Sequence, residues 1–308
     1  MEVLQTHTAG DPQNEEILWT DLSCTEIIKK LKELGEKIGR KPVKKLLKKH
    51  GYKKRKIQKR LSIGSTKYRD AQFKKIHQLK QQYQKSPNPI ISVDTKKKEP
   101  IGQLYRPGEV YNKEEIKVFD HDFKQLAEGI AVPHGIYDVK NNSAYINIGT
   151  NDETAEFACD SIKKWWNQQG QSDYPEAGSI LMLVDSGGSN SYRHYIFKEA
   201  LQKLVNMIDI EIRVAHYPPY CSKWNPIEHR LFPHITRSMQ GIPLKDHEMV
   251  KQLIEKTTTT TGLHVAANII KKVYRKGQKV ADDFKQKMKI KFDKDLGKWN
   301  YRVIPLRV

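Results

Sequence analysis

The stretch "ILMLVDSGGSN", residues 180–190, joins an apolar run to an aspartate and two glycines. A short run of consecutive apolar residues bounded by turn residues is typical of a buried strand. Asp185 follows this run directly, and Asp-Ser-Gly-Gly also has the composition of an ordinary turn. Gly187 and Gly188 would leave room for a backbone or a phosphate to come close. The stretch therefore poses two alternatives for Asp185, a turn residue or a metal ligand at the end of a buried strand.

From residue 90 onward the chain alternates between strand and helix patterns. β-Branched or alternating runs predict strands, and "GIYDV" and "SAYINIG" predict a hairpin turned at "KNN". Apolar residues at helical spacing predict the intervening helices. The predicted strands are 90–93, a hairpin over 135–149, 180–184 and 210–217, and the predicted helices are 152–170, 192–205 and one that begins at 225. This order predicts an α/β fold, a mixed sheet flanked by helices.

Three carboxylates stand at the ends of predicted elements. Asp94 and Asp185 each follow a β-rich run, and in open sheets functional groups gather beyond the carboxyl ends of the strands. Glu228 lies third in a helix that Asn225 would cap and Pro226 would begin, so a capping box is the alternative for this residue. Two Mg²⁺ ions need carboxylate oxygens from several elements, and substrate phosphates complete their shells. We therefore expect Asp94, Asp185 and Glu228 to converge as metal ligands.

Positive charge is concentrated near the N-terminus. The chain of 308 residues has 55 Lys and Arg against 36 Asp and Glu, a net charge of +19, which indicates a polyanionic partner. Between Lys29 and Arg60 there are 16 Lys and Arg against two acids. Apolar residues at helical spacing here, interrupted at "GRKP" and Gly51, predict short helices with a cationic face. This pattern favours a helix-turn-helix DNA-binding domain, and the alternative is a solvated lysine-rich hairpin with no role on DNA.

Changes in composition divide the chain into four predicted parts. A flexible tail occupies 1–22, a small all-α helix-turn-helix region 23–62 and a connector helix 63–88, and the catalytic α/β domain with a basic C-terminal extension occupies 89–308. A third basic helix is expected from Tyr52. The candidate DNA-binding residues of the second part are Lys44, Lys45, Lys48, Lys53, Lys54 and Arg55.

The sequence also excludes some classes of protein. No apolar run approaches the roughly 20 residues that span a bilayer, and the N-terminus lacks the basic and apolar segments of a secretory signal. Cys24, Cys159 and Cys221 lie far apart, without a CxxC pair, so they are interpreted as reduced thiols of a cytosolic protein. We therefore expect a cytoplasmic protein with no membrane partner.

Three basic residues lie near the carboxylates in the sequence. Lys96 follows Asp94 closely, and Lys223 and His229 flank Glu228. Each could contact a phosphate near the site. Lys96 could instead belong to a solvated surface run, and His229 could pack under its helix. We keep all three as candidate DNA-binding residues.

Other features indicate less. His216 and His234 lack metal-ligand partners at useful spacing, which favours surface or core roles. The stretch 96–133 has little periodicity and predicts a long loop beside the site. The region from 264 onward is basic and partly helical, and it could extend a path for DNA. Most tryptophans are interpreted as core residues and not as base-stacking residues, namely Trp165, Trp166, Trp224 and Trp299.

Several stretches resemble one known family. They are "ISVDTKKKE", "PHGIYD", "DETAEFA", "SIKKWW", "VDSGGSNSYR", "HYPPYCSKWNPIEHRLF" and "TTTTTGL". Together they strongly resemble the DDE transposases of bacterial insertion sequences in the ISAzo-thirteen family. The Pro-Pro to Asn-Pro-Ile-Glu-His stretch is also similar to the wider Tc/mariner-like group, and the resemblance covers nearly the whole chain.

This resemblance implies a ribonuclease-H-like catalytic domain in which Asp94, Asp185 and Glu228 form the DDE triad. It implies two Mg²⁺ ions, which Mn²⁺ can replace, and cleavage of element ends by water followed by attack of the freed 3′-hydroxyl on target DNA. The implied partner is double-stranded DNA, bound by a homo-oligomer in the bacterial nucleoid. Family members usually carry a further N-terminal region before the part that matches "AGDP", so we expect intact chemistry and a shortened module for recognising element ends.

Two other functions remain open. A catalytically silent remnant of a transposase, acting only as a DNA-binding protein, would bind DNA in a salt-sensitive way without metal-dependent cleavage. A structure-selective nuclease on the same fold would cut junctions or hybrids without joining ends.

Overall fold

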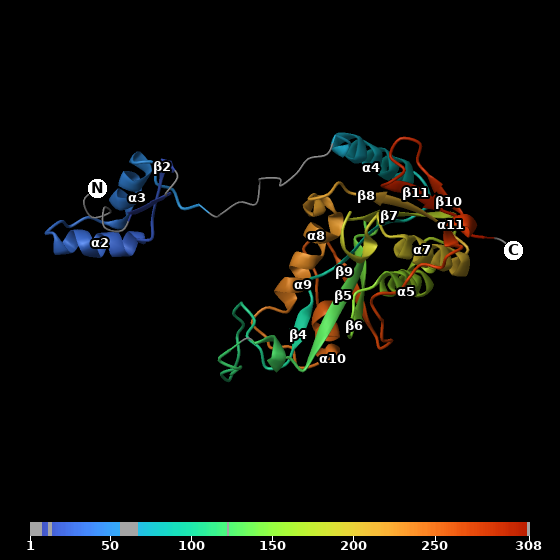
Figure 1. Cartoon of the computed structure of the whole chain (residues 1–308). Coiled ribbons are helices and arrows are strands. Elements are labelled where there is room, and N and C mark those ends of the chain that lie inside the picture. Colours follow the sequence, from blue (N-terminus) through green and yellow to red (C-terminus); the bar gives the residue numbers. More distant parts are fainter. Residues whose placement is uncertain (1–7, 12–13, 56–66, 122, 307–308) are drawn as a thin grey trace. The chain divides into compact units, whose positions relative to one another are not determined.

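The chain divides into two compact units, Met1–Leu61 and Ser62–Val308. The computed structural model describes residues 8–11, 14–55, 67–121 and 123–306, and Figure 1 draws the other residues as a thin grey trace.

The N-terminal unit combines a hairpin with two helices. β1 (Thr8–Asp11) pairs antiparallel with β2 (Asn14–Thr20), and α2 (Cys24–Glu33) and α3 (Arg40–Lys49) follow. The flexible tail predicted over 1–22 is therefore wrong for the described residues, whereas 23–55, the described part of the predicted all-α region, contains helices and no strand. The sequence shows no clear hairpin pattern over 1–22, because acids and a proline interrupt the alternation.

A small apolar cluster joins the two helices. Ile27 of α2 and Val43 of α3 are buried at its centre. A capping box begins α2: the Ser23 N–H donates to the Glu26 carboxylate (2.7 Å), and the Ser23 hydroxyl accepts from the Glu26 N–H (3.3 Å). The two predicted amphipathic helices are thus confirmed. Residues 52–55 of the expected third helix are not helical, and the rest of it lies outside the described residues.

The larger unit is built on a mixed sheet. In its described part the strands lie in the order β10-β11-β8-β7-β3-β5-β6-β9, and β4 pairs with β5. β3, β7 and β8 run parallel, as do β6 and β9, and the other neighbours are antiparallel. The strands are β3 (Ile90–Thr95), β4 (Glu99–Ile101), β5 (Gly129–Asp138), β6 (Ser143–Gly149), β7 (Ser179–Val184), β8 (Glu211–His216), β9 (His264–Ile270), β10 (Ile290–Phe292) and β11 (Asn300–Val303). The predicted mixed sheet and its β5–β6 hairpin are confirmed.

Helices cover both faces of this sheet (Figure 1). One face, here called the α5–α7 face, packs Val93 and Met182 against α5 (Ala155–Trp165) and α7 (Tyr195–Ile208). The opposite face, here called the α8 face, is covered by other helices. They are α4 (Arg69–Gln84), α8 (Pro226–Arg230), α9 (Phe232–Ser238) and α10 (His247–Glu255).

The predicted connector helix packs on the sheet. Ile76 and Leu79 of α4 are buried against Ile90, Leu181 and other residues of the α8 face. The apolar side predicted for this helix is confirmed, and α4 belongs to the larger unit. Shorter segments complete this unit: the 3₁₀ turns η1 (Lys124–Leu126), η3 (Gly188–Asn190) and η4 (Ser222–Trp224), the π-helical turn η2 (Trp166–Gly170), α6 (Gln171–Asp173) and α11 (Phe284–Lys287).

Two stretches contain more strand than predicted. β4 and the start of β5 lie inside the expected loop 96–133, and β9, β10 and β11 lie in the expected basic, partly helical region from 264 onward. β9 pairs with β6 and β11 pairs with β8, so these strands depend on partners far away in the sequence. Among the described residues, no helix is both long enough and apolar enough to cross a bilayer.

Candidate active site

Strand register brings Asp94 and Asp185 together. β3 and β7 are parallel neighbours that pair Ser92 with Leu183 and Val93 with Val184. One further step along this register places Asp94 beside Asp185. Because side chains alternate between the two faces of a strand, Asp94 shares a face with Ser92 and Asp185 shares a face with Leu183. That face is the α8 face.

The helix α8 brings Glu228 to the same edge of the sheet. It begins at Pro226, as predicted, with Glu228 in its first turn. Gly135 of β5 pairs with Asp94 and allows α8 to approach the sheet closely. A Cβ atom at Gly135 would lie only 2.7 Å from Ile227 Cδ1, closer than packed carbon atoms come.

The capping box considered for Glu228 is not the arrangement found at the start of α8. The backbone N–H of Asn225, which that box would use, donates to the Ser222 carbonyl oxygen (2.7 Å). The Asn225 side chain donates from Nδ2 to Asp185 Oδ1 (3.1 Å) instead of capping α8. The capping interpretation is therefore wrong for Asn225, which is buried and bonded to one of the three acids.

Ser92 occupies the position that a capping side chain would take. Its hydroxyl accepts from the Ile227 backbone N–H (3.0 Å) and donates to Asn225 Oδ1 (2.5 Å). Ser92 lies on β3, two residues before Asp94, and its side chain is fully buried. The sequence offered only one signal for it, a polar residue in an otherwise apolar strand.

The three carboxyl groups interact electrostatically. Burial raises the pKa of Asp94 well above its usual range, and the charge of Asp185 and then that of Glu228 raise it further, as does a hydrogen bond with Glu228. Burial also raises the pKa of Asp185 to about 6, although the hydrogen bond from Asn225 acts in the opposite direction and the charge of Glu228 adds to the increase. The structure thus brings Asp94, Asp185 and Glu228 near one another, and their role as metal ligands remains a prediction.

A cluster of carboxylates of this kind suits a divalent cation. Carboxylate oxygens are the ligands that Mg²⁺ and Mn²⁺ prefer, and a cation would relieve the repulsion that raises the pKa of Asp94. In the part of the chain that the structure describes, no three Asp, Glu, His or Cys side chains already form a closed cluster around one point. The fit to a divalent cation therefore depends on the carboxylate chemistry of Asp94, Asp185 and Glu228 and on their proximity to one another.

Hydrogen bonds from neighbouring side chains hold the backbone at Asp185 in place. Nδ1 of the buried His216 donates to the Asp185 carbonyl oxygen (2.8 Å), and Tyr301 bonds the other ring nitrogen (3.2 Å). Burial lowers the pKa of His216 to about 4, so its ring is neutral near pH 7. The Ser186 hydroxyl donates to the Tyr217 carbonyl oxygen. These bonds hold the chain as it leaves β7, and they give His216 the core role that was predicted.

Lys96 does not lie free beside the site. It is buried and forms an ion pair with Glu99, which also accepts from Arg106 Nη1 (2.9 Å). These contacts tie the start of the 102–128 segment to β4. They favour a structural role for Lys96 over the predicted contact with phosphate.

Lys223 and His229 are exposed on either side of Glu228. Lys223 Nζ lies 5.6 Å from the centre of the Trp224 ring. Partial burial lowers the pKa of His229, and so do the charges of Arg230 and Lys80. Sequence reasoning missed Lys80 and Arg230 as neighbours of His229, because Lys80 comes from α4 and approaches Arg230 only in the folded chain.

The tryptophans differ in burial. Trp165, Trp166 and Trp299 are buried, as predicted, but Trp224 is 53% exposed, so the core interpretation is wrong for this residue. Phe73 of α4 holds one edge of the Trp224 ring at a centroid distance of 6.1 Å. Tyr220 in the same loop is 69% exposed. Two aromatic side chains are thus presented to solvent between β8 and α8.

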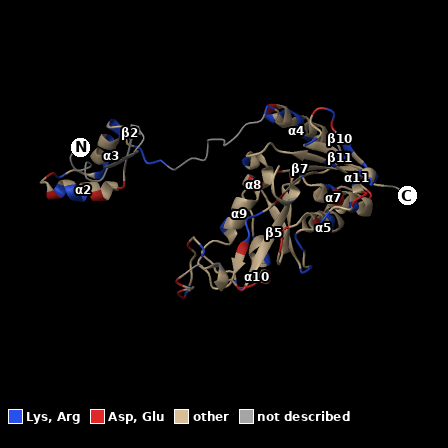
Figure 2. Ribbon diagram, viewed as in Figure 1, with Lys and Arg blue, Asp and Glu red and all other residues tan. Residues whose placement is uncertain are grey.

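The candidate DNA-binding residues of the N-terminal unit are all exposed. Figure 2 shows Lys and Arg in blue on α2 and α3 of this unit. The exposed candidates are Lys44, Lys45, Lys48, Lys53, Lys54 and Arg55. Their exposure agrees with a cationic surface and leaves the role of that surface a prediction.

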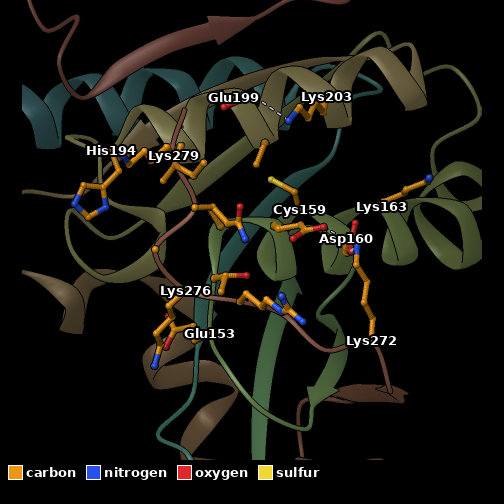
Figure 3. A pocket seen from close by; sticks show the side chains of 18 of the residues that line it. Glu153, Cys159, Asp160, Lys163, His194, Glu199, Lys203, Lys272, Lys276 and Lys279 are labelled. Carbon is orange, nitrogen blue, oxygen red and sulfur yellow. Dashed lines mark hydrogen bonds and ion pairs between the residues drawn. The ribbon is translucent and has the colours of Figure 1, made fainter. Parts of the chain in front are cut away.

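A cavity of about 840 Å³ lies between α5, α7 and residues 272–279 (Figure 3). Lys272 ion-pairs there with Glu156 (2.8 Å) and Asp160 (2.8 Å), and Lys203 ion-pairs with Glu199 (2.8 Å). None of the three site carboxylates lines this cavity. It is therefore separate from the carboxylate site, which lies at the edge of the α8 face.

About three quarters of the chain aligns with solved transposase structures. "Mos1 transposase paired-end complex with left transposon end" aligns with a TM-score of 0.46 and 14% identity, covering 76% of this chain and 66% of that chain. The Mos1 mariner paired-end complex with Mg aligns with a TM-score of 0.46 and 13% identity over the same shares. This chain thus spans just under two thirds of the length of those chains. A search of curated proteins finds no significant match.

The sequence itself matches a protein family over almost its full length. That family is described as the Rhodopirellula transposase DDE domain, and the match covers residues 1–305. This chain therefore belongs to the family of transposase DDE domains.

Proposed function

We propose that this protein is a DNA transposase that cleaves the ends of its element and joins them to target DNA with the help of divalent metal ions. The observation that supports this most strongly is the convergence of Asp94, Asp185 and Glu228, from three separate elements, at one edge of the sheet. The chain belongs to a transposase family, so the proposal assigns these residues as the ligands of two Mg²⁺ ions, or of Mn²⁺ in their place.

The proposed reaction has two steps at phosphorus. Bound ions would supply an activated nucleophile and stabilise the leaving oxygen. In the first step the oxygen of water bonds to the scissile phosphorus, and the 3′-oxygen leaves and is protonated. In the second step that 3′-hydroxyl loses its proton and its oxygen bonds to a phosphorus of the target, while the target's own 3′-oxygen leaves that phosphorus and is protonated. Asp94, Asp185 and Glu228 hold the ions throughout and form no covalent bond to DNA.

DNA would approach the site over the loop between β8 and α8. Lys223, His229 and Arg230 are exposed there and offer charge to phosphates. The exposed ring of Trp224 offers a stacking surface for a base, an interaction worth about 1–3 kcal/mol. Lys96 is the weakest of the predicted contacts, because it is already paired with Glu99.

Recognition of element ends is assigned to the N-terminal unit. Its exposed basic residues would bind the phosphates of double-stranded DNA through α2 and α3. This surface keeps the predicted helix-turn-helix role as a proposal. The protein would act in the bacterial cytoplasm, on the DNA of the nucleoid.

The deciding experiment uses labelled double-stranded DNA that carries the inverted repeats flanking the gene. The full chain with Mg²⁺ or Mn²⁺ is expected to produce both nicked and joined products, and Asp185→Asn is expected to lose both. Asp173→Asn, the same change at an exposed acid on α6, is the matched control. Intact activity in Asp185→Asn would overturn the assignment.

The same experiment separates the two alternative functions. Salt-sensitive binding without cleavage under any metal would indicate a catalytically silent DNA-binding remnant. Cleavage of junctions or hybrids without joined products would indicate a structure-selective nuclease. Neither alternative has an observation that favours it over transposition.

A homo-oligomer on DNA is also proposed, and the segment 102–128 supports it. Large apolar side chains are exposed along this segment, namely Tyr105, Val110, Tyr111, Ile116, Phe119, Phe123 and Leu126. Such concentrations of exposed apolar surface mark interaction sites. Phe119→Ser with Tyr111→Ser is expected to dissociate the complex on DNA in analytical ultracentrifugation, whereas Val273→Ser, at an exposed apolar residue elsewhere, is expected to leave it intact.

A further inference from the structure

We propose that Ser92 and Asn225 are positioning residues, which hold the three acids in register through one directed chain of hydrogen bonds ending on Asp185. The inference rests on the proposed function, since it assigns Asp185 as a metal ligand. It goes further by naming two fully buried residues, outside the proposed set of ligands, that set where the metal ligands lie.

The chain of bonds consists of buried groups in close contact. The Ile227 backbone N–H donates to Ser92 Oγ (3.0 Å), Ser92 Oγ donates to Asn225 Oδ1 (2.5 Å), and Asn225 Nδ2 donates to Asp185 Oδ1 (3.1 Å). The side chains of Ser92 and Asn225 are both fully buried. Leaving a buried polar group without its partner is destabilising, so each of these bonds is strongly favoured.

The direction of the chain follows from the donors. A backbone N–H can only donate, so Ser92 Oγ is the acceptor of the first bond. Its single hydroxyl hydrogen is then available for Asn225, and the oxygen of the Asn225 amide must face Ser92. The amide nitrogen consequently faces Asp185, which must accept. The start of α8 thus determines which way the Asn225 amide points.

This chain joins every element that bears a site carboxylate. Ser92 lies two residues before Asp94 on the same face of β3, Asn225 lies three residues before Glu228, and the last bond ends on Asp185 itself. Only Oδ1 of Asp185 is engaged by Asn225, so the second oxygen remains available to an ion. Groups of this kind, which bond to a ligand and not to the metal, are known to orient the ligands of metal sites.

The test measures Mn²⁺ affinity of the full chain by electron paramagnetic resonance of free Mn²⁺, without DNA. Ser92→Ala and Asn225→Ala are each expected to weaken Mn²⁺ binding by about 10–100-fold, the usual effect of removing a partner of a metal ligand. Ser92→Thr keeps the hydroxyl and is expected to restore affinity. A role in packing alone would not distinguish Thr from Ala in this way.

The matched control is Ser161→Ala. Ser161 is a fully buried serine of α5 whose hydroxyl has no hydrogen-bond partner among the described residues. Its removal is expected to leave Mn²⁺ affinity unchanged. In the double variant Ser92→Ala/Asn225→Ala, affinity is expected to match that of Asn225→Ala alone, because Ser92 acts on Asp185 through Asn225.

The outcomes separate this inference from the proposed function. If the wild-type chain binds no Mn²⁺, the proposed function fails. If the wild type binds Mn²⁺ and the folded Ser92→Ala and Asn225→Ala variants bind it equally well, the positioning role is overturned. Circular dichroism checks folding. Should Ser92→Ala not fold, Ser92→Cys, which keeps the shape with a weaker donor, is expected to lose affinity, and unchanged affinity in that variant would overturn the inference.

Discussion

The two faces of the central sheet share the same strands but differ in role: one forms an apolar core, and the other carries the candidate active site. On the α5–α7 face, Val93 and Met182 pack among apolar side chains of α5 and α7. On the α8 face, their neighbours Ser92 and Asp94 carry hydrogen bonds and charge to α8. Consecutive residues of one strand therefore serve stability and chemistry in turn, since side chains alternate between faces.

The packing on the α5–α7 face therefore positions the site on the opposite face of the sheet. The α5–α7 face supplies a continuous apolar core, which fixes the register of β3 and β7. The α8 face can then end in three carboxylates whose burial and mutual repulsion work against folding, as the raised pKa values of Asp94 and Asp185 indicate. Changes on the two faces should accordingly have opposite effects.

The largest expected effect comes from Asp94→Asn. Cleavage should fall by at least about 100-fold, because even the partner of a metal ligand is worth about 10–100-fold, while the thermal midpoint of the metal-free protein should not fall. DNA cleavage and calorimetry measure the two quantities. Val93→Ala, at the next residue on the opposite face, should lower the midpoint and keep cleavage. If Asp94→Asn unfolds much of the protein while the remaining folded fraction still cleaves DNA, the two faces do not have these separate roles.

Met182→Ala tests the α5–α7 face. Met182 is fully buried, and removing its side chain should lower the free energy of unfolding by about 2–5 kcal/mol. Urea unfolding measures this loss. Mn²⁺ affinity of the folded variant should not change, and a large change would mean that the two faces are not independent.

Asp185→Asn should stabilise the metal-free protein in a pH-dependent way. The folded pKa of Asp185, about 6, lies above its usual value of 3.8, so the folded wild type binds more protons than the unfolded chain. That contribution to stability is present below the usual pKa and is lost as the pH rises through about 6. Denaturation at several pH values should show that the free energy of unfolding of the variant exceeds that of the wild type by a margin that grows, as the pH rises, to about 1–3 kcal/mol. An advantage that shrinks with rising pH would contradict this account.

Gly135→Ala should have the smallest effect, and it should lower both stability and cleavage. The added Cβ meets Ile227, so α8 must move, at a cost of about 1–3 kcal/mol of stability, and cleavage should fall as Glu228 shifts. Gly178→Ala is the matched control, because no atom lies within 4 Å of its added Cβ. A normal cleavage rate in Gly135→Ala would mean that α8 tolerates displacement.

Much of this arrangement could be predicted from the sequence. Asp94 and Asp185 follow strands with clear patterns, and Pro226 marks the start of a helix, so local signals sufficed to predict the mixed sheet and the edge where the acids meet. The predictions that proved wrong depended on distant partners. β9 is strand because it lies beside β6, and its own sequence follows a low-complexity run of threonines.

Sequence reasoning also missed how the acids are held. Asn225 has the sequence position of a helix cap. Its side chain bonds instead to Asp185, 40 positions away, and the local sequence does not indicate this contact. Ser92 and Asn225 are 133 positions apart, and no local pattern reports such a contact. Trp224 resembles the buried tryptophans in sequence, and only the folded loop shows that about half of this residue is exposed.

The parallel pairing of β3 with β7 limits how this protein can change over evolution. Inserting or deleting a single residue in either strand would turn its acid toward the α5–α7 face, where Val93 and Met182 pack among apolar side chains. Point substitutions in these strands can be absorbed one at a time, whereas changes of length cannot. Gains and losses of residues among relatives should therefore fall between the strands, above all in 102–128, and leave β3 and β7 constant in length.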